Sequence, residues 1–116
     1  MYDENNIFAK IIRKEIPCNP VYEDGKVLFF NDINPKAKTH ILGIPKNPVI
    51  NLREFIFNTD KDTVKYFFDK VLEVIKKFDL DRSGYRLITN DGKDANQEVA
   101  HFHIHILGGE NLGGLR

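Results

Sequence analysis

In the sequence HFHIHI at residues 101–106, three of the chain's four histidines alternate with apolar residues. Side chains of a β-strand point alternately to its two faces, so this alternation predicts a strand over residues 100–107. The apolar residues would face a core, and the three imidazoles would share the opposite face. Histidine is an unusual choice for the polar face of a strand, where threonine, lysine or glutamate would be usual. The histidine row is therefore the candidate functional site.

The segments before this strand predict an α+β domain. Apolar residues at helical spacing indicate helices over residues 5–14 and 59–77. Runs rich in β-forming residues indicate strands at residues 19–23, 27–30, 40–44 and 85–89, the first two joined by a turn at Asp24-Gly25. The order of helix, three strands, helix and two strands favours an antiparallel sheet over parallel βαβ winding.

Composition and charge exclude several classes of protein. The 116 residues are the size of one domain, and 17 lysines and arginines balance 17 aspartates and glutamates. A neutral balance argues against non-specific binding to nucleic acid or to an anionic membrane. No apolar run approaches the roughly 20 residues that span a bilayer, and the polar, acidic N-terminus does not resemble a secretory signal. The single cysteine, Cys18, cannot form an internal disulfide, so we expect a cytoplasmic protein.

Three interpretations of the histidine row compete. In the first, the row is only the polar face of a half-buried strand. In the second it is a metal site, but the outer α-carbons of the row would lie about 13 Å apart, too far for one tetrahedral ion to bind all three imidazoles. Two of the three together with His40 could still bind an ion. In the third, the imidazoles act on a phosphate ester or amide, since a neutral imidazole with a pKa of about 6.5 is both a nucleophile and a proton carrier.

Other catalytic patterns are absent from the sequence. No serine lies in a nucleophile elbow, no paired carboxylates flank the row, and there is no glycine fingerprint of a phosphate-binding loop or dinucleotide-binding fold. The loop at residues 90–97 contains Asn90, Gly92 and Gln97, which could supply amide donors to an anion. The sequence therefore favours chemistry at phosphorus as the role of the histidine row.

Four segments of the chain resemble one known family. HFHIHILGG at residues 101–109 resembles the motif of the histidine triad (HIT) superfamily, in which three histidines alternate with apolar residues. IFAKIIRKEIP at 7–17, FNDINPKAKTHILGIPK at 30–46 and GYRLITNDG at 84–92 resemble segments of its Hint branch, the histidine triad nucleotide-binding proteins. The resemblance implies a single HIT domain over residues 1–116, with a five-stranded antiparallel sheet and two helices. It also implies a homodimer in which the two sheets join into one of ten strands.

The resemblance further implies an activity. Hint-like proteins hydrolyse nucleoside phosphoramidates, such as AMP joined to an amine through a P–N bond. The implied substrate is thus a purine nucleotide, with no cofactor and no metal required. By its place in the motif, His103 would be the nucleophile that forms a covalent nucleotidyl-histidine intermediate. His105 would bind the phosphate, and His101 and His40 would form a supporting proton network.

Matching residues imply a nucleotide site around the triad. Asn90 and Gln97 would lie at the phosphate, and Asp32 would bind the ribose hydroxyls. Taken alone, Asp32 predicts an Asx turn onto Asn34-Pro35. The resemblance also implies an apolar base pocket, formed by Ile7, Phe8, Ile11, Ile16, Phe30 and Ile33, of which the first three would otherwise be assigned to the core.

The chain departs from the family in two places. Glu98 follows Gln97 where the family commonly has a serine nearby, and a carboxylate there would repel an anionic phosphate. The run IPKNP at residues 44–48 lacks a further histidine that the family has. Two alternatives therefore stay open: a nucleotide- or zinc-binding module without significant catalysis, and a dinucleoside polyphosphate hydrolase, as in the Fhit-like branch.

Overall fold

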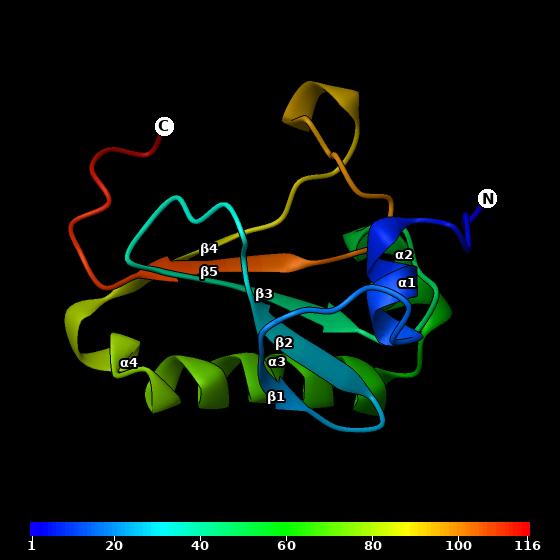
Figure 1. Cartoon of the computed structure of the whole chain (residues 1–116), viewed down its shortest axis with the longest axis horizontal. Coiled ribbons are helices and arrows are strands. Elements are labelled where there is room, and N and C mark those ends of the chain that lie inside the picture. Colours follow the sequence, from blue (N-terminus) through cyan, green and yellow to red (C-terminus); the bar gives the residue numbers. More distant parts are fainter.

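The computed structural model describes residues 1–116 and contains one antiparallel sheet with helices on both faces (Figure 1). The strands are β1 (Pro20–Glu23), β2 (Val27–Asn31), β3 (Thr39–Pro45), β4 (Tyr85–Ile88) and β5 (Ile104–Gly108). They lie in the order β1-β2-β3-β5-β4. The helices are α1 (Ile7–Ile12), α2 (Leu52–Asn58), α3 (Lys61–Lys77) and α4 (Leu80–Ser83), with a 3₁₀ turn at Lys93–Ala95. The predicted α+β fold with a five-stranded antiparallel sheet is confirmed.

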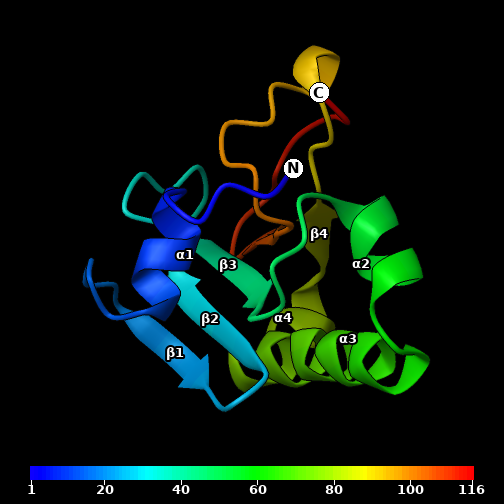
Figure 2. The same ribbon diagram turned by 90° about the vertical axis from the view of Figure 1, so that its right-hand side faces the viewer.

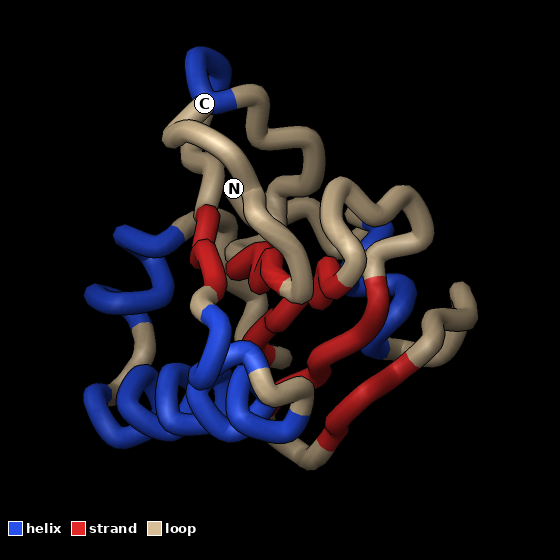
Figure 3. The backbone as a smooth tube through the Cα atoms, turned by 90° about the vertical axis from the view of Figure 1, so that its left-hand side faces the viewer, coloured by secondary structure: helices blue, strands red, loops and turns tan.

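The two faces of the sheet carry separate apolar clusters. Helices α2, α3 and α4 pack on one face, with Phe55, Phe67 and Leu80 among the buried residues of a thirteen-residue core (Figure 2). Helix α1 packs on the other face, where Phe8 and Ile11 meet a smaller set from the sheet. Figure 3 shows the long α3 lying along one side of the strands. None of the helices combines the length and the apolar character that crossing a bilayer requires.

The register between β3 and β5 determines which side chains meet on the α1 face. His40 lies opposite Leu107, and Leu42 lies opposite His105. Because side chains two residues apart share a face, His40 and His105 are diagonal neighbours on the same side of the sheet. That side is the α1 face, since Leu42 belongs to the apolar cluster around α1. The sheet itself therefore brings together two of the four histidines.

Two of the four helices correspond to the predicted ones. α1 is shorter than the predicted 5–14, and α3 begins at Lys61 instead of at Thr59. The N-cap of α3 is Asp60, whose carboxylate accepts a hydrogen bond from the Thr63 N–H (2.8 Å). The short helix α4 lies between α3 and β4, where no element was predicted. The two predicted helices differ from the observed ones only in where they begin and end.

Helix α2 is an addition that the apolar periodicity does not predict. It is only seven residues long, and its single buried residue is Phe55. Its start carries a local signal, because Asn51 accepts from the Glu54 N–H (2.9 Å) and the Glu54 carboxylate accepts from the Ile50 N–H (2.9 Å). This reciprocal pairing resembles a capping box and could have located the helix.

The predicted strand over residues 100–107 is wrong in its first half. β5 begins at Ile104, which pairs with Gly43, and the chain before it leaves the sheet. There the Phe102 N–H donates to the Val49 carbonyl in the loop after β3 (2.8 Å). The Pro45 carbonyl at the end of β3 is bonded to the His101 ring (2.8 Å) and not to a neighbouring strand. The predicted alternation nevertheless persists: Phe102, Ile104 and Ile106 lie in the thirteen-residue core, while the rings of His101 and His103 pack against Phe8 of α1 and that of His103 against His105.

Candidate functional site

His40 of β3 and His105 of β5 form the centre of a hydrogen-bonded group on the α1 face. Their rings meet through His40 Nε2 and His105 Nδ1, 2.9 Å apart. Asp32, which follows β2, places a carboxylate oxygen 3.4 Å from the same His40 nitrogen. The register of β3 and β5 explains the contact between the two rings. The Asp32 N–H donates to the His40 carbonyl (3.0 Å), and this bond holds Asp32 beside His40. Sequence reasoning predicted all three as site residues, and the structure brings them together.

A main-chain amide determines the protons of this pair. The Lys36 N–H donates to His40 Nδ1 (3.0 Å), so this nitrogen carries a lone pair and a neutral His40 carries its proton on Nε2. That proton faces His105 Nδ1, which then accepts, so a neutral His105 carries its own proton on Nε2. His105 is thereby presented as a hydrogen-bond donor, as binding to a phosphoryl oxygen requires.

In His103 the two ring nitrogens have the opposite roles to those in His40. Its Nδ1 lies 2.7 Å from the main-chain oxygen of His101, which can only accept, so Nδ1 carries the proton. The lone pair is left on Nε2, which makes no hydrogen bond within the chain. The ring packs against the edges of Phe8 (centroids 4.9 Å apart) and His105 (5.1 Å). Of the three triad histidines, His103 is the one whose ring nitrogen is free to act as a nucleophile.

His101 is fully buried and is bonded at both ring nitrogens. Its Nε2 lies 2.8 Å from the Pro45 carbonyl, and its Nδ1 lies 2.6 Å from the Tyr2 hydroxyl. The expected network joining His101 to His40 is not found, because His40 pairs with His105. Tyr2 is a site residue that sequence reasoning missed. It stands alone in a polar segment, and no periodicity or motif singles it out.

Burial keeps these histidines neutral at neutral pH. Removal from water lowers the pKa of His101 to about 4, and removal from water together with the neighbouring His103 and His40 lowers the pKa of His105 to about 4. Burial also lowers the pKa of His103 and that of His40, although the Asp32 carboxylate opposes the shift at His40. Neutral rings can act as nucleophiles and as directional hydrogen-bond donors without an acidic medium.

The predicted base-pocket residues divide into two groups. Phe8, Ile11 and Phe30 are buried in the α1 cluster, and Ile16 packs against it. Ile33 is 92% exposed and Ile7 is 45% exposed. Since Ile33 adjoins Asp32, an exposed apolar side chain lies beside the candidate ribose carboxylate. The buried members position α1, and the two exposed ones are available to a ligand.

The loop between β4 and β5 is closed by Gln97. Its amide donates to the Ile50 carbonyl (2.8 Å) and the Val99 carbonyl (3.1 Å), and its oxygen accepts from the Gly92 N–H (3.0 Å). Gln97 therefore shapes the loop around the candidate phosphate site. Asn90 is half-buried after Thr89, whose hydroxyl donates to the His103 carbonyl (2.9 Å). Glu98 is exposed.

A metal ion fits the central group poorly. Ligand atoms of Asp32, His40 and His105 lie within 4.8 Å of one another. However, His40 Nδ1 already accepts from the Lys36 N–H, so a neutral His40 has no lone pair on the nitrogen that faces the cluster. Coordination would require the proton to move to Nδ1, against a main-chain donor.

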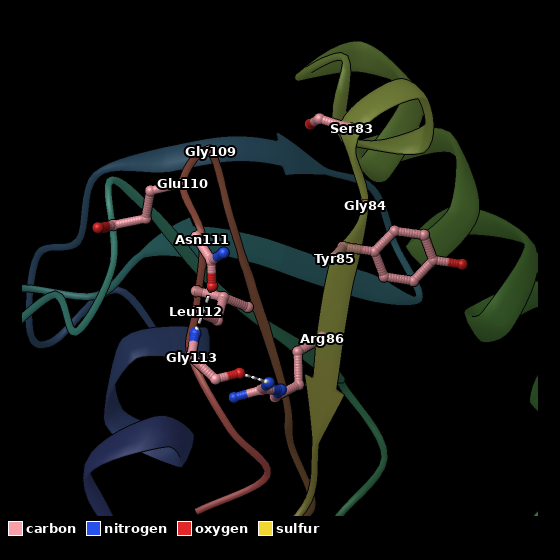
Figure 4. A pocket seen from close by; sticks show the side chains of 9 residues that line it. All are labelled: Ser83, Gly84, Tyr85, Arg86, Gly109, Glu110, Asn111, Leu112 and Gly113. Atoms are coloured by element: carbon pink, nitrogen blue, oxygen red, sulfur yellow. Dashed lines mark hydrogen bonds between the residues drawn. The ribbon is translucent and has the colours of Figure 1, made fainter.

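A cavity of about 560 Å³ lies away from the histidines. It is bounded by residues 83–86 at the start of β4 and by residues 109–113 of the C-terminal segment (Figure 4). Arg86 donates to the Gly113 carbonyl across it (3.1 Å). None of the predicted site residues lines this cavity.

Comparisons with known proteins point to one family. The profile of the HIT domain family matches residues 13–112. A HIT-like protein of Rickettsia prowazekii is 47% identical over 99% of this chain and 96% of its own length. A HIT family hydrolase from Clostridium thermocellum superposes with a TM-score of 0.85, at 37% identity over 97% of this chain and 96% of its own. A histidine triad nucleotide-binding protein from Candida albicans superposes with a TM-score of 0.78, at 34% identity over 88% of this chain and 73% of its own.

A relative from Zea mays bears the name 14 kDa zinc-binding protein and is 42% identical over 95% of this chain and 86% of its own length. The relatives of this chain thus include a plant protein. The family profile, the nearly complete coverage by these relatives and the arrangement of the three alternating histidines lead to one conclusion. This chain belongs to the HIT domain family.

Proposed function

We propose that the protein hydrolyses the P–N bond of purine nucleoside phosphoramidates through a covalent nucleotidyl-histidine intermediate at His103. The observation that carries the proposal is the bond from His103 Nδ1–H to the His101 carbonyl, which leaves a lone pair on Nε2. The ring of His105, with its proton on Nε2, packs against that of His103. The similar HIT family hydrolase and nucleotide-binding protein support this class of chemistry.

In the first step, His103 Nε2 attacks phosphorus and the P–N bond to the amine breaks, the amine taking a proton from water. The intermediate is a phosphorylated imidazolium that keeps its proton on Nδ1. The His101 carbonyl, already 2.7 Å from Nδ1, stabilises that positive charge. Because the acceptor is in place before the reaction, little reorganisation is needed. Water then attacks phosphorus, the proton that it releases neutralises the hydroxide left by the first step, and the nucleoside monophosphate leaves with His103 restored.

His105 donates its Nε2–H to a phosphoryl oxygen in the same steps. The relay from the Lys36 amide through His40 fixes that proton on the nitrogen where it is needed. Such a prearranged donor lowers the barrier most where negative charge develops. His40 is thus a positioning residue, acting on His105 through the 2.9 Å hydrogen bond.

Asp32 and the exposed apolar side chains would hold the nucleoside. One Asp32 oxygen accepts from the Asn34 N–H (2.8 Å), which is the Asx turn predicted from the sequence. The other oxygen, 3.4 Å from His40 Nε2, keeps acceptor capacity for a ribose hydroxyl. Ile33, on the same turn, supplies an apolar surface for a base. Turn formation and ligand binding are compatible at Asp32, since each uses a different oxygen.

Rapid quench with an adenosine phosphoramidate, followed by intact mass measurement, tests the proposal. The wild type should accumulate an adduct of the mass of an adenylyl group. His103→Ala should lose the adduct and lower turnover by on the order of 10³-fold or more. The same variant should bind AMP in calorimetry, which controls for folding. An adduct that persists in the variant would overturn the assignment of the nucleophile. A faster reaction with a dinucleoside polyphosphate would favour the Fhit-like alternative.

Zinc binding without catalysis is the second candidate, favoured by the three converging ligands at Asp32, His40 and His105. The Lys36 amide on His40 Nδ1 opposes it. We expect protein purified without chelator to contain no stoichiometric zinc by elemental analysis, and chelator to leave turnover unchanged. One bound zinc per chain, lost together with His40→Ala, would establish this candidate instead.

A further inference from the structure

The N-terminal segment, residues 1–6, is fastened to the domain at several points. Arg13 donates to the Glu4 carbonyl (2.8 Å), and the Asn6 side chain donates to the Asp3 carbonyl (2.8 Å). Asn6 is also the N-cap of α1, where its side-chain oxygen accepts from the Ala9 N–H (2.9 Å). At the far end of this segment, Tyr2 reaches the His101 ring, which lies 99 residues later in the chain. The segment thus fixes one side chain against the triad.

The direction of the Tyr2 hydrogen bond follows from its neighbours. The Pro45 carbonyl can only accept, so His101 Nε2 carries the proton of the neutral ring. Nδ1 is therefore an acceptor, and the Tyr2 hydroxyl donates to it across 2.6 Å. The Tyr2 ring also meets the His101 ring edge to face, with centroids 5.6 Å apart. Because His101 is 0% exposed, a lost hydroxyl would leave a buried nitrogen without its partner.

His101 transmits this restraint to His103. The main-chain oxygen of His101 accepts from His103 Nδ1–H, and this bond determines which nitrogen of His103 is free. The ring of His101 is held at both ends, by Tyr2 and by Pro45. Neither contact is a main-chain bond between paired strands, since Pro45 lies at the end of β3 and β5 begins only at Ile104. The two hydrogen bonds to the His101 ring thus hold this part of the backbone in place, as main-chain hydrogen bonds to a neighbouring strand would do within a sheet.

We propose that Tyr2 is a positioning residue, which acts through His101 to hold His103 with its free nitrogen directed for attack. The proposal rests on the proposed function for its kinetic consequence. Its structural consequence, the state of the two rings in the ligand-free protein, does not depend on any activity. The kinetic consequence and the structural consequence can therefore fail separately.

Tyr2→Phe is the test, because it removes only the hydroxyl. Ser83→Ala is the control, since it also removes only a hydroxyl, from an exposed residue at the end of α4 on the opposite face of the sheet. With an adenosine phosphoramidate, we expect Tyr2→Phe to lower kcat by about tenfold and to change KM by less than about twofold. The nucleoside-binding groups at Asp32 and Ile33 do not touch Tyr2. Ser83→Ala should match the wild type in both constants.

Ring-nitrogen NMR of the ligand-free protein is the second measurement. In Tyr2→Phe, the ¹⁵N resonance of His101 Nδ1 should move downfield as it loses its donor, and the His103 Nδ1–H signal should be lost to faster exchange with water. An unchanged kcat, or an unchanged His103 signal, would overturn the proposal. A KM that rises as much as kcat falls would also overturn it, because Tyr2 would then contact the substrate. If the wild type forms no adduct, the proposed function fails, while the NMR comparison still decides the role of Tyr2.

Discussion

At His40 and His103, a hydrogen bond between each ring and one main-chain group determines which ring nitrogen carries the proton. The Lys36 amide places a lone pair on His40 Nδ1, and the His101 carbonyl places a proton on His103 Nδ1. Main-chain groups cannot change their donor or acceptor character, whereas a side-chain partner such as a carboxylate can be protonated. The tautomers therefore follow from the path of the backbone and persist wherever the rings stay neutral.

The buried histidines make stability depend on pH in a defined window. The pKa of His101 is lowered from 6.5 to about 4, so the unfolded chain binds a proton there more readily than the folded one. His105 behaves in the same way. Stability should then fall as the pH drops below 6.5, and the contribution of these two residues should level off near pH 4. Urea unfolding at a series of pH values measures the effect.

The variant His105→Asn provides the control for that series. It removes one of the two strongly shifted imidazoles, so the fall in unfolding free energy between pH 6.5 and 4 should be shallower than in the wild type. A stability that is flat between these two values in the wild type would contradict the burial of neutral rings.

At the scale of elements, Asp24 joins the hairpin of β1 and β2 to helix α3. One carboxylate oxygen accepts from the Lys26 and Val27 amides (2.8 and 3.0 Å), and the other accepts from the hydroxyls of Tyr22 (2.8 Å) and of Tyr66 on α3. Burial by itself would raise the pKa of Asp24, but these hydrogen bonds outweigh it and hold the pKa well below its ordinary value. A single turn residue thus anchors an edge hairpin.

Asp24→Asn should therefore destabilise the fold. The substitution replaces one acceptor oxygen by an NH₂ group. In either orientation of the side chain, this donor faces other donors, either the two tyrosine hydroxyls or the two main-chain amides. We therefore expect the free energy of unfolding to fall by about 2 kcal/mol. Asp81→Asn, at an exposed position in α4, should change it by less than about 0.5 kcal/mol. Urea unfolding of both variants beside the wild type makes the comparison. Equal effects of the two substitutions would show that the Asp24 hydrogen bonds contribute nothing specific.

The sequence predicts the elements that depend on interactions between neighbouring residues, and it does not predict those that depend on contacts between distant residues. Local periodicity located α3 and the strands, because an amphipathic stripe or an alternating run is a property of neighbouring residues. The first half of the predicted strand at 100–107 was wrong because its departure from the sheet depends on Pro45 and Val49, more than fifty residues earlier. Tyr2 was missed for the same reason. Contacts between distant residues leave no periodic trace.

At the scale of the whole molecule, β4 is an edge strand, paired on one side with β5. Its other edge presents unpaired main-chain groups, and Tyr85 and Leu87 are exposed there. An unprotected edge of this kind is a template for pairing with another strand. We propose that two copies pair through β4, which would produce the ten-stranded sheet that the family resemblance implies.

Leu87→Glu should weaken this dimer. In a two-fold arrangement the two new carboxylates lie near each other, and the buried apolar contact is lost. Sedimentation velocity should show a dimer for the wild type and a large monomer fraction for the variant. Leu72→Glu, on the exposed face of α3, is the matched control and should remain dimeric. A monomeric wild type, or equal behaviour of the two variants, would count against pairing through β4.

The late start of β5 has a consequence for how the motif tolerates change. Because residues 101–103 lie outside the ladder, inserting or deleting one residue among them would not by itself shift the register of Ile104–Gly108 with β3 and β4. The same edit would turn Phe102, which is 1% exposed, out of the thirteen-residue core and the His103 ring away from the His101 carbonyl. The spacing of these three residues therefore serves packing and chemistry at once, and an edit there should cost both.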